Sequence, residues 1–179
     1  PLFFRRKLLI MNTKRLTLLA LFTTLSLAVY AIESAIPPLI PIPGIKLGLA
    51  NIITLILLKK ASVKDAALVL LARILLSTLL FGQMLSLLYS LAGGLFSLLI
   101  MAFSTKLLHQ KMTYLSGALG GLAHNMGQIL IAFFLTSTVG VFSYLPFLVI
   151  SGILTGLFTG LCAEFAEKHL KWKDWAKNP

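Results

Sequence analysis

Acidic residues are scarce in this chain, and their scarcity excludes one kind of site. The 179 residues include five Asp and Glu against sixteen Lys and Arg, which gives a formal net charge of +11. The two aspartates, Asp65 and Asp174, lie far apart. Magnesium that holds a diphosphate is bound by carboxylates at close spacing, so this chain lacks the residues for such a centre. We therefore expect no metal and no resident cofactor.

Cysteine and nucleotide-binding motifs are also scarce or absent. Cys162 is the single cysteine, so the sequence offers no disulfide framework and no thiolate metal site. A Gly-x-x-x-x-Gly-Lys-Ser/Thr segment, the usual phosphate-binding loop, does not occur. We expect that this chain is not an enzyme and does not hydrolyse ATP by itself.

Hydrophobic residues are what the chain has in excess. They make up 58% of it, and its mean hydropathy is +0.95. One soluble core cannot bury so much apolar surface, so the sequence predicts an all-α integral membrane protein. Spanning helices need roughly 20 apolar residues each. The hydrophobic runs between charged clusters predict six helices, near 16–36, 48–59, 63–80, 84–104, 112–135 and 141–167.

The second of these helices is too short to span a bilayer alone. It follows a proline-rich apolar stretch, "IPPLIPIPGIKLG", and ends at the basic pair Lys59 and Lys60. We expect a half-buried or tilted helix that the extended segment before it completes. Residues 37–48 would form an apolar loop outside the membrane.

Basic residues predict the topology, because Lys and Arg are retained on the cytoplasmic side of short loops. They lie before the first predicted helix, in every second connection between helices and after the last helix. Only Lys46 falls in an outer loop, and only Arg73 falls inside a helix. The remaining fourteen are Arg5, Arg6, Lys7, Lys14, Arg15, Lys59, Lys60, Lys64, Lys106, Lys111, Lys168, Lys171, Lys173 and Lys177. Both termini are thus predicted to be cytoplasmic, with an N-terminal segment 1–15, one membrane domain 16–167 and a basic tail 168–179. Contact with anionic lipid headgroups accounts for the charge, and we expect no nucleic acid partner.

The first predicted helix has an alternative interpretation. The basic start and the apolar run after it resemble a signal peptide with a small residue at Ala31. Six helices fit the alternation of charge better, so we favour a retained helix. The segment "MNTKR" is typical of the beginning of a protein, so Met11 is a candidate for the natural start of translation.

Small side chains form a stripe along the first helix. Ala20, Thr24, Ala28, Ala31 and Ala35 recur every three or four residues and share one side. Such a stripe lets another helix approach closely, either a neighbour in this chain or a separate subunit. Glu33 points roughly to the opposite side, so a stripe that faces a partner would turn Glu33 into the bundle.

Polar residues of the other helices are predicted to lie in the outer half of the bilayer. They are Asn51, Arg73, Gln83, His124, Asn125 and Gln128, and Glu33 joins them at the end of the first helix. Unpaired ionisable groups in a membrane cost about 2.5 kcal/mol or more, so these residues should face the interior and find partners. One interpretation is a Glu33–Arg73 ion pair with interhelical hydrogen bonds around it. The other is a pocket that opens outward and binds a ligand.

Three segments resemble a known family. "PGIKLGLANIITLILL" (43–58), "ARILLSTLLFGQMLSLLYSLAGGLFSLLIM" (72–101) and "GALGGLAHNMGQILIA" (117–132) are similar to Gx transporter proteins, often named heptaprenyl diphosphate synthase component I. That family is similar in size and layout to the substrate-binding S components of energy-coupling factor (ECF) transporters of bacterial cell membranes. The resemblance implies a six-helix bundle, a capped outer pocket and a first helix that docks on a T component driven by two ATPases. Here the cap would be 37–48, and the docking face would be the small-residue stripe.

The leading hypothesis is therefore a membrane-embedded subunit that captures a small, partly hydrophobic, anionic molecule, such as a vitamin, a quinone precursor or an isoprenoid-related compound. Arg73 and Lys46 would bind its anionic group, and Glu33 would be their counter-charge or a hydrogen-bond acceptor. His124, Asn125 and Gln128 would orient the ligand, with Asn51 and Gln83 nearby. Two alternatives remain open: a non-catalytic membrane partner of a prenyl diphosphate synthase, and a stand-alone transporter that relays protons through His124, Glu33 and Arg73.

Overall fold

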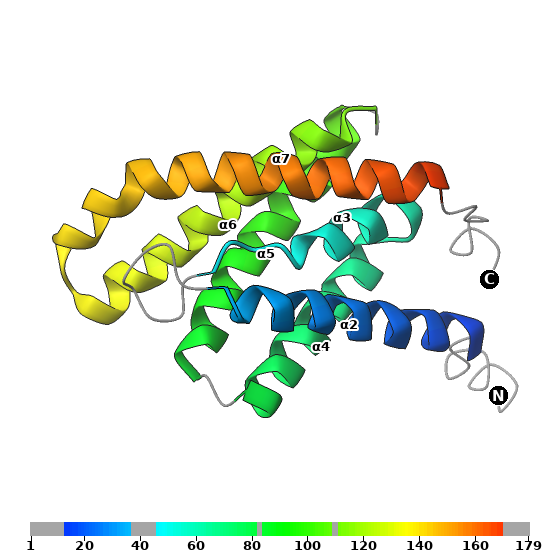
Figure 1. Cartoon of the computed structure of the whole chain (residues 1–179), viewed down its shortest axis with the longest axis horizontal. Coiled ribbons are helices and arrows are strands. Elements are labelled where there is room, and N and C mark those ends of the chain that lie inside the picture. The colour runs from blue at the N-terminus through cyan, green and yellow to red at the C-terminus, as the bar shows by residue number, and fades with distance from the viewer. Residues whose placement is uncertain (1–12, 37–45, 82–83, 109–110, 170–179) are drawn as a thin grey trace, which may run out of the picture.

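The computed structural model describes residues 13–36, 46–81, 84–108 and 111–169, and within them every regular element is helical. Six α-helices are present there, as the hydrophobic runs predict. They are α2 (Thr13–Ser34), α3 (Asn51–Lys60), α4 (Val63–Phe81), α5 (Met84–Leu107), α6 (Thr113–Thr136) and α7 (Leu145–His169). A 3-10 helix, η1 (Val139–Tyr144), joins α6 to α7. Figure 1 shows these helices as one bundle around the short helix α3.

The predicted helix boundaries are close to the observed ones, with the largest error at α7. Its start was expected at 141, but the chain first forms η1 and α7 begins at Leu145. Helix α6 ends at Thr136, and the next residue, Ser137, adopts a left-handed conformation with φ 50° and donates its N–H to the Phe133 carbonyl oxygen. Pro146 then lies in the first turn of α7, where a missing N–H costs nothing.

Four segments of the described chain are long and apolar enough to cross a membrane: Thr13–Ser34, Met84–Leu107, Thr113–Thr136 and Val139–His169. Helix α3 has only 10 residues. Helix α4 has 19 residues but carries Lys64, Asp65 and Arg73. The described chain is therefore helical with four candidate membrane-spanning segments, as a helical membrane protein has, while six spans and cytoplasmic termini remain predictions.

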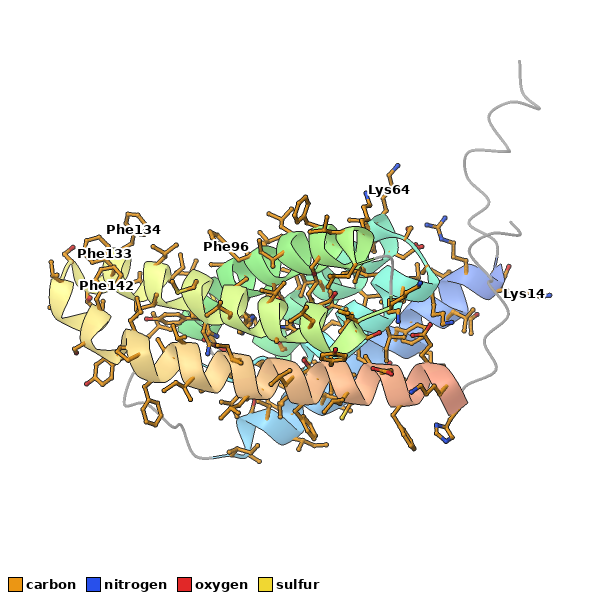
Figure 2. The ribbon with its side chains drawn as sticks, turned by 90° about the horizontal axis from the view of Figure 1, so that it is seen from above. Lys14, Lys64, Phe96, Phe133, Phe134 and Phe142 are labelled. Carbon is orange, nitrogen blue, oxygen red and sulfur yellow. The ribbon has the colours of Figure 1, made fainter. Side chains whose placement is uncertain are left out.

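The two ends of the bundle differ in chemistry. Figure 2 places Lys14 and Lys64 at one end, which we call the basic end, and Phe133, Phe134 and Phe142 at the other. At the basic end, Lys59 of α3 binds Glu167 of α7, and Lys60 lies 2.9 Å from the same carboxylate. Another ion pair joins α2 to α4 there.

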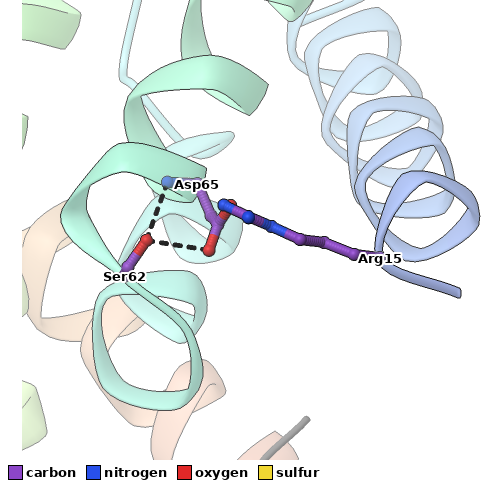
Figure 3. A network of polar contacts seen from close by, with 3 residues as sticks. All are labelled: Arg15, Ser62 and Asp65. Atoms are coloured by element: carbon purple, nitrogen blue, oxygen red, sulfur yellow. Dashed lines mark hydrogen bonds and ion pairs between the residues drawn. The ribbon is translucent and has the colours of Figure 1, made fainter. Parts of the chain in front are cut away.

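The ion pair between α2 and α4 contains a buried aspartate. Asp65 is 1% exposed and lies 2.5 Å from an Arg15 guanidinium nitrogen. Ser62 donates its hydroxyl to the other carboxylate oxygen at 2.8 Å, and the Asp65 N–H donates to the Ser62 oxygen (Figure 3). Asp65 and Ser62 thus cap the start of α4, and the ion pair with Arg15 attaches α2 to α4.

Helix α3 is the centre of the bundle, since it contacts each of the other five α-helices. Most of its residues are buried, including Asn51 at its first position. Figure 1 shows it beginning partway along the bundle and running toward the chain termini. The structure thus confirms a short second helix preceded by a non-helical segment, here Lys46–Gly48.

Helices α6 and α7 pack backbone to backbone through glycines. A Cβ atom added to Gly121 would lie 2.2 Å from the Gly152 carbonyl oxygen, and one added to Gly117 would lie 2.3 Å from that of Gly156. No side chain fits at such distances. The glycines therefore let the backbones of α6 and α7 come into direct contact.

Candidate functional site

Buried polar side chains gather where the chain enters α3. They come from helices α2, α3, α4 and α6. Their exposed fractions are 5% for Glu33, 3% for Asn51, 3% for Arg73, 3% for His124 and 0% for Gln128. Burial of so many polar groups is costly unless each finds a hydrogen-bond partner. The contacts of each side chain therefore show which of them hold the fold together and which are left unpaired.

Glu33 caps the start of α3. Its carboxylate accepts hydrogen bonds from the Gly48 N–H at 2.6 Å and the Leu49 N–H at 3.0 Å. These N–H groups precede the first helical turn, where the helix dipole favours an anion. The Glu33–Arg73 ion pair, one of the two interpretations of the sequence, is not formed among the described residues. Each carboxylate oxygen instead accepts a backbone N–H of residues 48 and 49.

Gln128 binds the segment before α3 from the other side. With the amide oriented to satisfy its neighbours, its nitrogen donates to the Lys46 carbonyl oxygen at 3.0 Å and its oxygen accepts from the Lys46 N–H at 3.2 Å. The same oxygen lies 3.1 Å from His124 Nε2. Thr155 of α7 adds a longer contact, 3.4 Å, to the Leu47 carbonyl oxygen. Side chains of α2, α6 and α7 thus bind four consecutive residues, 46–49, which we call the α3 leader.

His124 lies between two glycines. A Cβ atom on Gly48 would lie 2.8 Å from the His124 ring, and one on Gly93 of α5 would lie at the same distance from the opposite ring atoms Cε1 and Nδ1. Gly48 also has φ +82°, a conformation that other residues rarely adopt. The imidazole therefore fills a slot that only glycines leave open, and it joins the α3 leader to α5.

Asn125 points elsewhere. Its Nδ2 donates to the Leu148 carbonyl oxygen at 2.7 Å and contacts the Ser151 hydroxyl at 3.2 Å, both on α7. It therefore contributes to the α6–α7 seam, about 100° around the helix from His124.

Lys46 turns its ammonium toward α2. The Nζ atom donates to the Ser34 hydroxyl at 2.6 Å and lies 3.6 Å from the centre of the Tyr30 ring. The Tyr30 hydroxyl is 3.0 Å from the Ser86 hydroxyl of α5. The Arg73 guanidinium carbon lies 5.8 Å from the same ring centre. Tyr30 is therefore a neighbour of both cations.

Several buried atoms of this region have no hydrogen-bond partner. They include Arg73 Nε, both amide atoms of Asn51 and His124 Nδ1. Arg73 is absent from the ion pairs of the described residues, although it interacts electrostatically with Glu33 and His124. Unpaired polar atoms are rare in folded cores, so these atoms are the ones in the cluster with hydrogen-bonding capacity left.

The small-residue stripe lies on the outside of α2. Ala20, Thr24, Ala28 and Ala35 are exposed, and Ala31 is half-buried. The buried face of α2 carries Leu19, Phe22, Ser26, Tyr30 and Glu33. As expected, Glu33 faces the bundle and the stripe faces away from it, so no described helix of this chain covers the stripe. Docking on a separate subunit stays a prediction.

The sequence did not single out four contributors to this region: Tyr30, Ser34, Gly48 and Thr155. Tyr30 precedes Glu33 by three residues and so lies on the same helix face, which is a signal that the sequence offers. Contacts of Gly48 and Thr155 join residues far apart in the chain, and no local pattern shows them. Gln83 and most of the predicted cap, 37–45, lie outside the described residues.

Comparison with known proteins identifies the family. The sequence profile of the family described as "Heptaprenyl diphosphate synthase component I" matches residues 22–166. The chain therefore belongs to this family, as its motifs indicate. Searches of curated proteins and of solved structures give no match.

Proposed function

We propose that this member of the heptaprenyl diphosphate synthase component I family is a membrane-embedded subunit that binds a small, partly hydrophobic, anionic organic molecule. The cationic side chain of Arg73 is the observation that carries the proposal. It is 3% exposed, its Nε has no hydrogen-bond partner, and the nearest carboxylate, Glu33, is held by the α3 leader.

A buried charge without a direct ion pair is expensive in a membrane protein and marks a functional site by default. An anionic ligand would supply the missing partner through charge-assisted hydrogen bonds with the guanidinium. The Asn51 amide, also unpaired, would orient the ligand. Glu33, Gln128 and His124 then have a positioning role, since they hold the α3 leader and with it the position of Asn51.

Movement of the ligand across the bilayer requires energy from another protein in this proposal. The chain has no phosphate-binding loop, and the exposed stripe on α2 offers a surface without long side chains for a partner helix. We propose that this face docks on an ECF-type T component with two ATPase subunits, and that the substrate is a vitamin, a quinone precursor or an isoprenoid-related compound.

A binding measurement tests the proposal. Wild-type protein purified in mild detergent is analysed by mass spectrometry for co-purifying small molecules, and the compound found is titrated against wild type, Arg73→Gln and the control Lys64→Gln. Lys64 is an exposed cation on the same helix as Arg73. We expect at least about tenfold weaker binding for Arg73→Gln and unchanged binding for Lys64→Gln. Equal affinities of all three proteins would remove Arg73 from the site.

The family description favours a second candidate, a non-catalytic membrane component that associates with the other component of a prenyl diphosphate synthase. This function needs a surface for a soluble partner at the basic end. Changing the exposed residues Lys64, Lys106 and Lys111 to Gln would then abolish complex formation while Arg73→Gln would not. The opposite result favours ligand binding.

A further inference from the structure

The charges around Arg73 indicate how many negative charges the ligand carries. Glu33 interacts electrostatically with Arg73 and Lys46, and Arg73 interacts with Glu33 and Tyr30. The cluster therefore contains two cations and one carboxylate. With a neutral tyrosine and a neutral histidine, its net charge is one positive.

We infer that the ligand carries a single negative charge on a carboxylate-type group and that the site discriminates against phosphate and diphosphate groups. The inference rests on the proposed function. One anionic charge would neutralise the cluster, whereas a doubly or triply charged group would leave buried negative charge without compensation.

The two cations are not equivalent. Lys46 already donates to Ser34 and lies over the Tyr30 ring, so its charge is partly satisfied within the protein. The Arg73 guanidinium carbon lies farther from the same ring, 5.8 Å from its centre, and Arg73 Nε has no hydrogen-bond partner. Its planar guanidinium matches the two oxygens of a carboxylate. We place the ligand carboxylate at Arg73.

A diphosphate would need further cations, and the described residues offer none near this cluster. Proteins often bind diphosphates through magnesium held by carboxylates. Glu33 is occupied by the Gly48 and Leu49 N–H groups, and Asp65 is bound by Arg15 and Ser62 at the start of α4. Both carboxylates are thus bound within the protein, so neither is free to hold magnesium.

Asn51 adds a requirement for hydrogen bonding. Its Nδ2 and Oδ1 atoms are both buried without partners. An amide offers a donor and an acceptor, so a ligand that satisfies both atoms carries an acceptor and a donor of its own. A carboxylate next to a hydroxyl or N–H group has this pattern.

A headgroup series tests the charge. Phenylacetate, benzyl phosphate, benzyl diphosphate and uncharged benzyl alcohol share an aromatic ring and differ in charge. Their binding near neutral pH is measured by calorimetry on the full chain in lipid nanodiscs, for wild type, Arg73→Gln and Glu33→Gln. We expect wild type to prefer phenylacetate over both phosphorylated probes by about tenfold or more, and Arg73→Gln to lose the preference for an anion.

Glu33→Gln raises the net charge of the cluster by one while keeping an oxygen that can accept a hydrogen bond. We expect this variant to shift the preference toward benzyl phosphate, which carries about two negative charges near neutral pH. Lys46→Met, at a half-buried position, lowers the charge by one and provides a second variant if Glu33→Gln does not fold. It should weaken phenylacetate binding relative to benzyl alcohol.

The outcomes separate the inference from the proposed function. Wild-type binding that depends on Arg73 but favours benzyl phosphate or diphosphate would overturn the single-charge inference and keep the ligand-binding function. Absence of Arg73-dependent binding for every anionic probe would count against both. Preference for phenylacetate that Glu33→Gln reverses would support both.

Discussion

The Gln128 side chain and the Lys46 backbone form a reciprocal pair of hydrogen bonds, 3.0 and 3.2 Å long, across 82 positions of sequence. This contact explains much of the "AHNMGQ" segment. Gln128 binds the α3 leader, His124 fills the slot between Gly48 and Gly93, and Asn125 binds α7. Side chains that looked suited to a ligand thus position the α3 leader and the helices around it.

Gln128→Leu is expected to destabilise the protein by about 3 kcal/mol. The change leaves the Lys46 N–H, the Lys46 carbonyl and His124 Nε2 without this partner, and an unsatisfied buried polar group costs about 1–3 kcal/mol. Thermal unfolding in detergent measures the loss. Hydrogen exchange at Leu47, Gly48 and Leu49 should accelerate in the same variant. Tyr114→Phe, which removes an exposed hydroxyl from α6, is the control and should leave both measurements unchanged.

Gly48→Ala and Gly93→Ala are expected to disrupt the slot for His124. Each added methyl would lie 2.8 Å from imidazole atoms, and alanine at position 48 also adopts φ +82° with strain. We expect a loss of about 2 kcal/mol or more for each variant. Gly140→Ala is the matched control, because its nearest neighbour would lie at an ordinary 3.4 Å. Equal unfolding temperatures for all three variants would contradict the packing of His124 described above.

The small-residue stripe on α2 yields a prediction about partners. Ala28→Leu places a large side chain on an exposed face, so unfolding in detergent should change by less than about 0.5 kcal/mol. If α2 docks on a T component, the same change should abolish its co-purification. Ser143→Leu, also a small-to-large change at an exposed position, should retain the partner. If both variants retain the T component, the docking surface lies outside the small-residue stripe.

The fold was largely predictable because hydrophobic runs and basic residues are properties of single segments. Those patterns located six helices, including short α3. The spacing of α2 residues placed Glu33 opposite the small-residue stripe, and the cost of an exposed charge in a membrane predicted that Glu33 faces inward. The partners of the polar residues were not predictable in the same way. A buried carboxylate needs a partner, and for Glu33 either Arg73 or the N–H groups of Gly48 and Leu49 would meet that need. Which of the two it binds depends on the path of the α3 leader, which no sequence pattern shows.

Two asparagines distinguish ligand binding from helix packing, and their substitution should have opposite effects. Asn125 donates to the Leu148 carbonyl oxygen, so Asn125→Ala removes a buried hydrogen bond and should cost about 1–2 kcal/mol of stability. It should leave the ligand affinity of the folded protein unchanged, because the side chain faces α7. Asn51 has no partner for either amide atom.

Asn51→Leu therefore removes two unpaired polar atoms from a buried position and should leave stability unchanged or raise it by about 1 kcal/mol. Binding of the co-purifying compound should weaken about tenfold or more, since the ligand would lose its partner on α3. Calorimetric titration and thermal unfolding of both variants in the same detergent give the comparison. A large loss of stability in Asn51→Leu with unchanged affinity would show that the Asn51 amide serves the fold, and the ligand site would then have to be rebuilt around Arg73 alone.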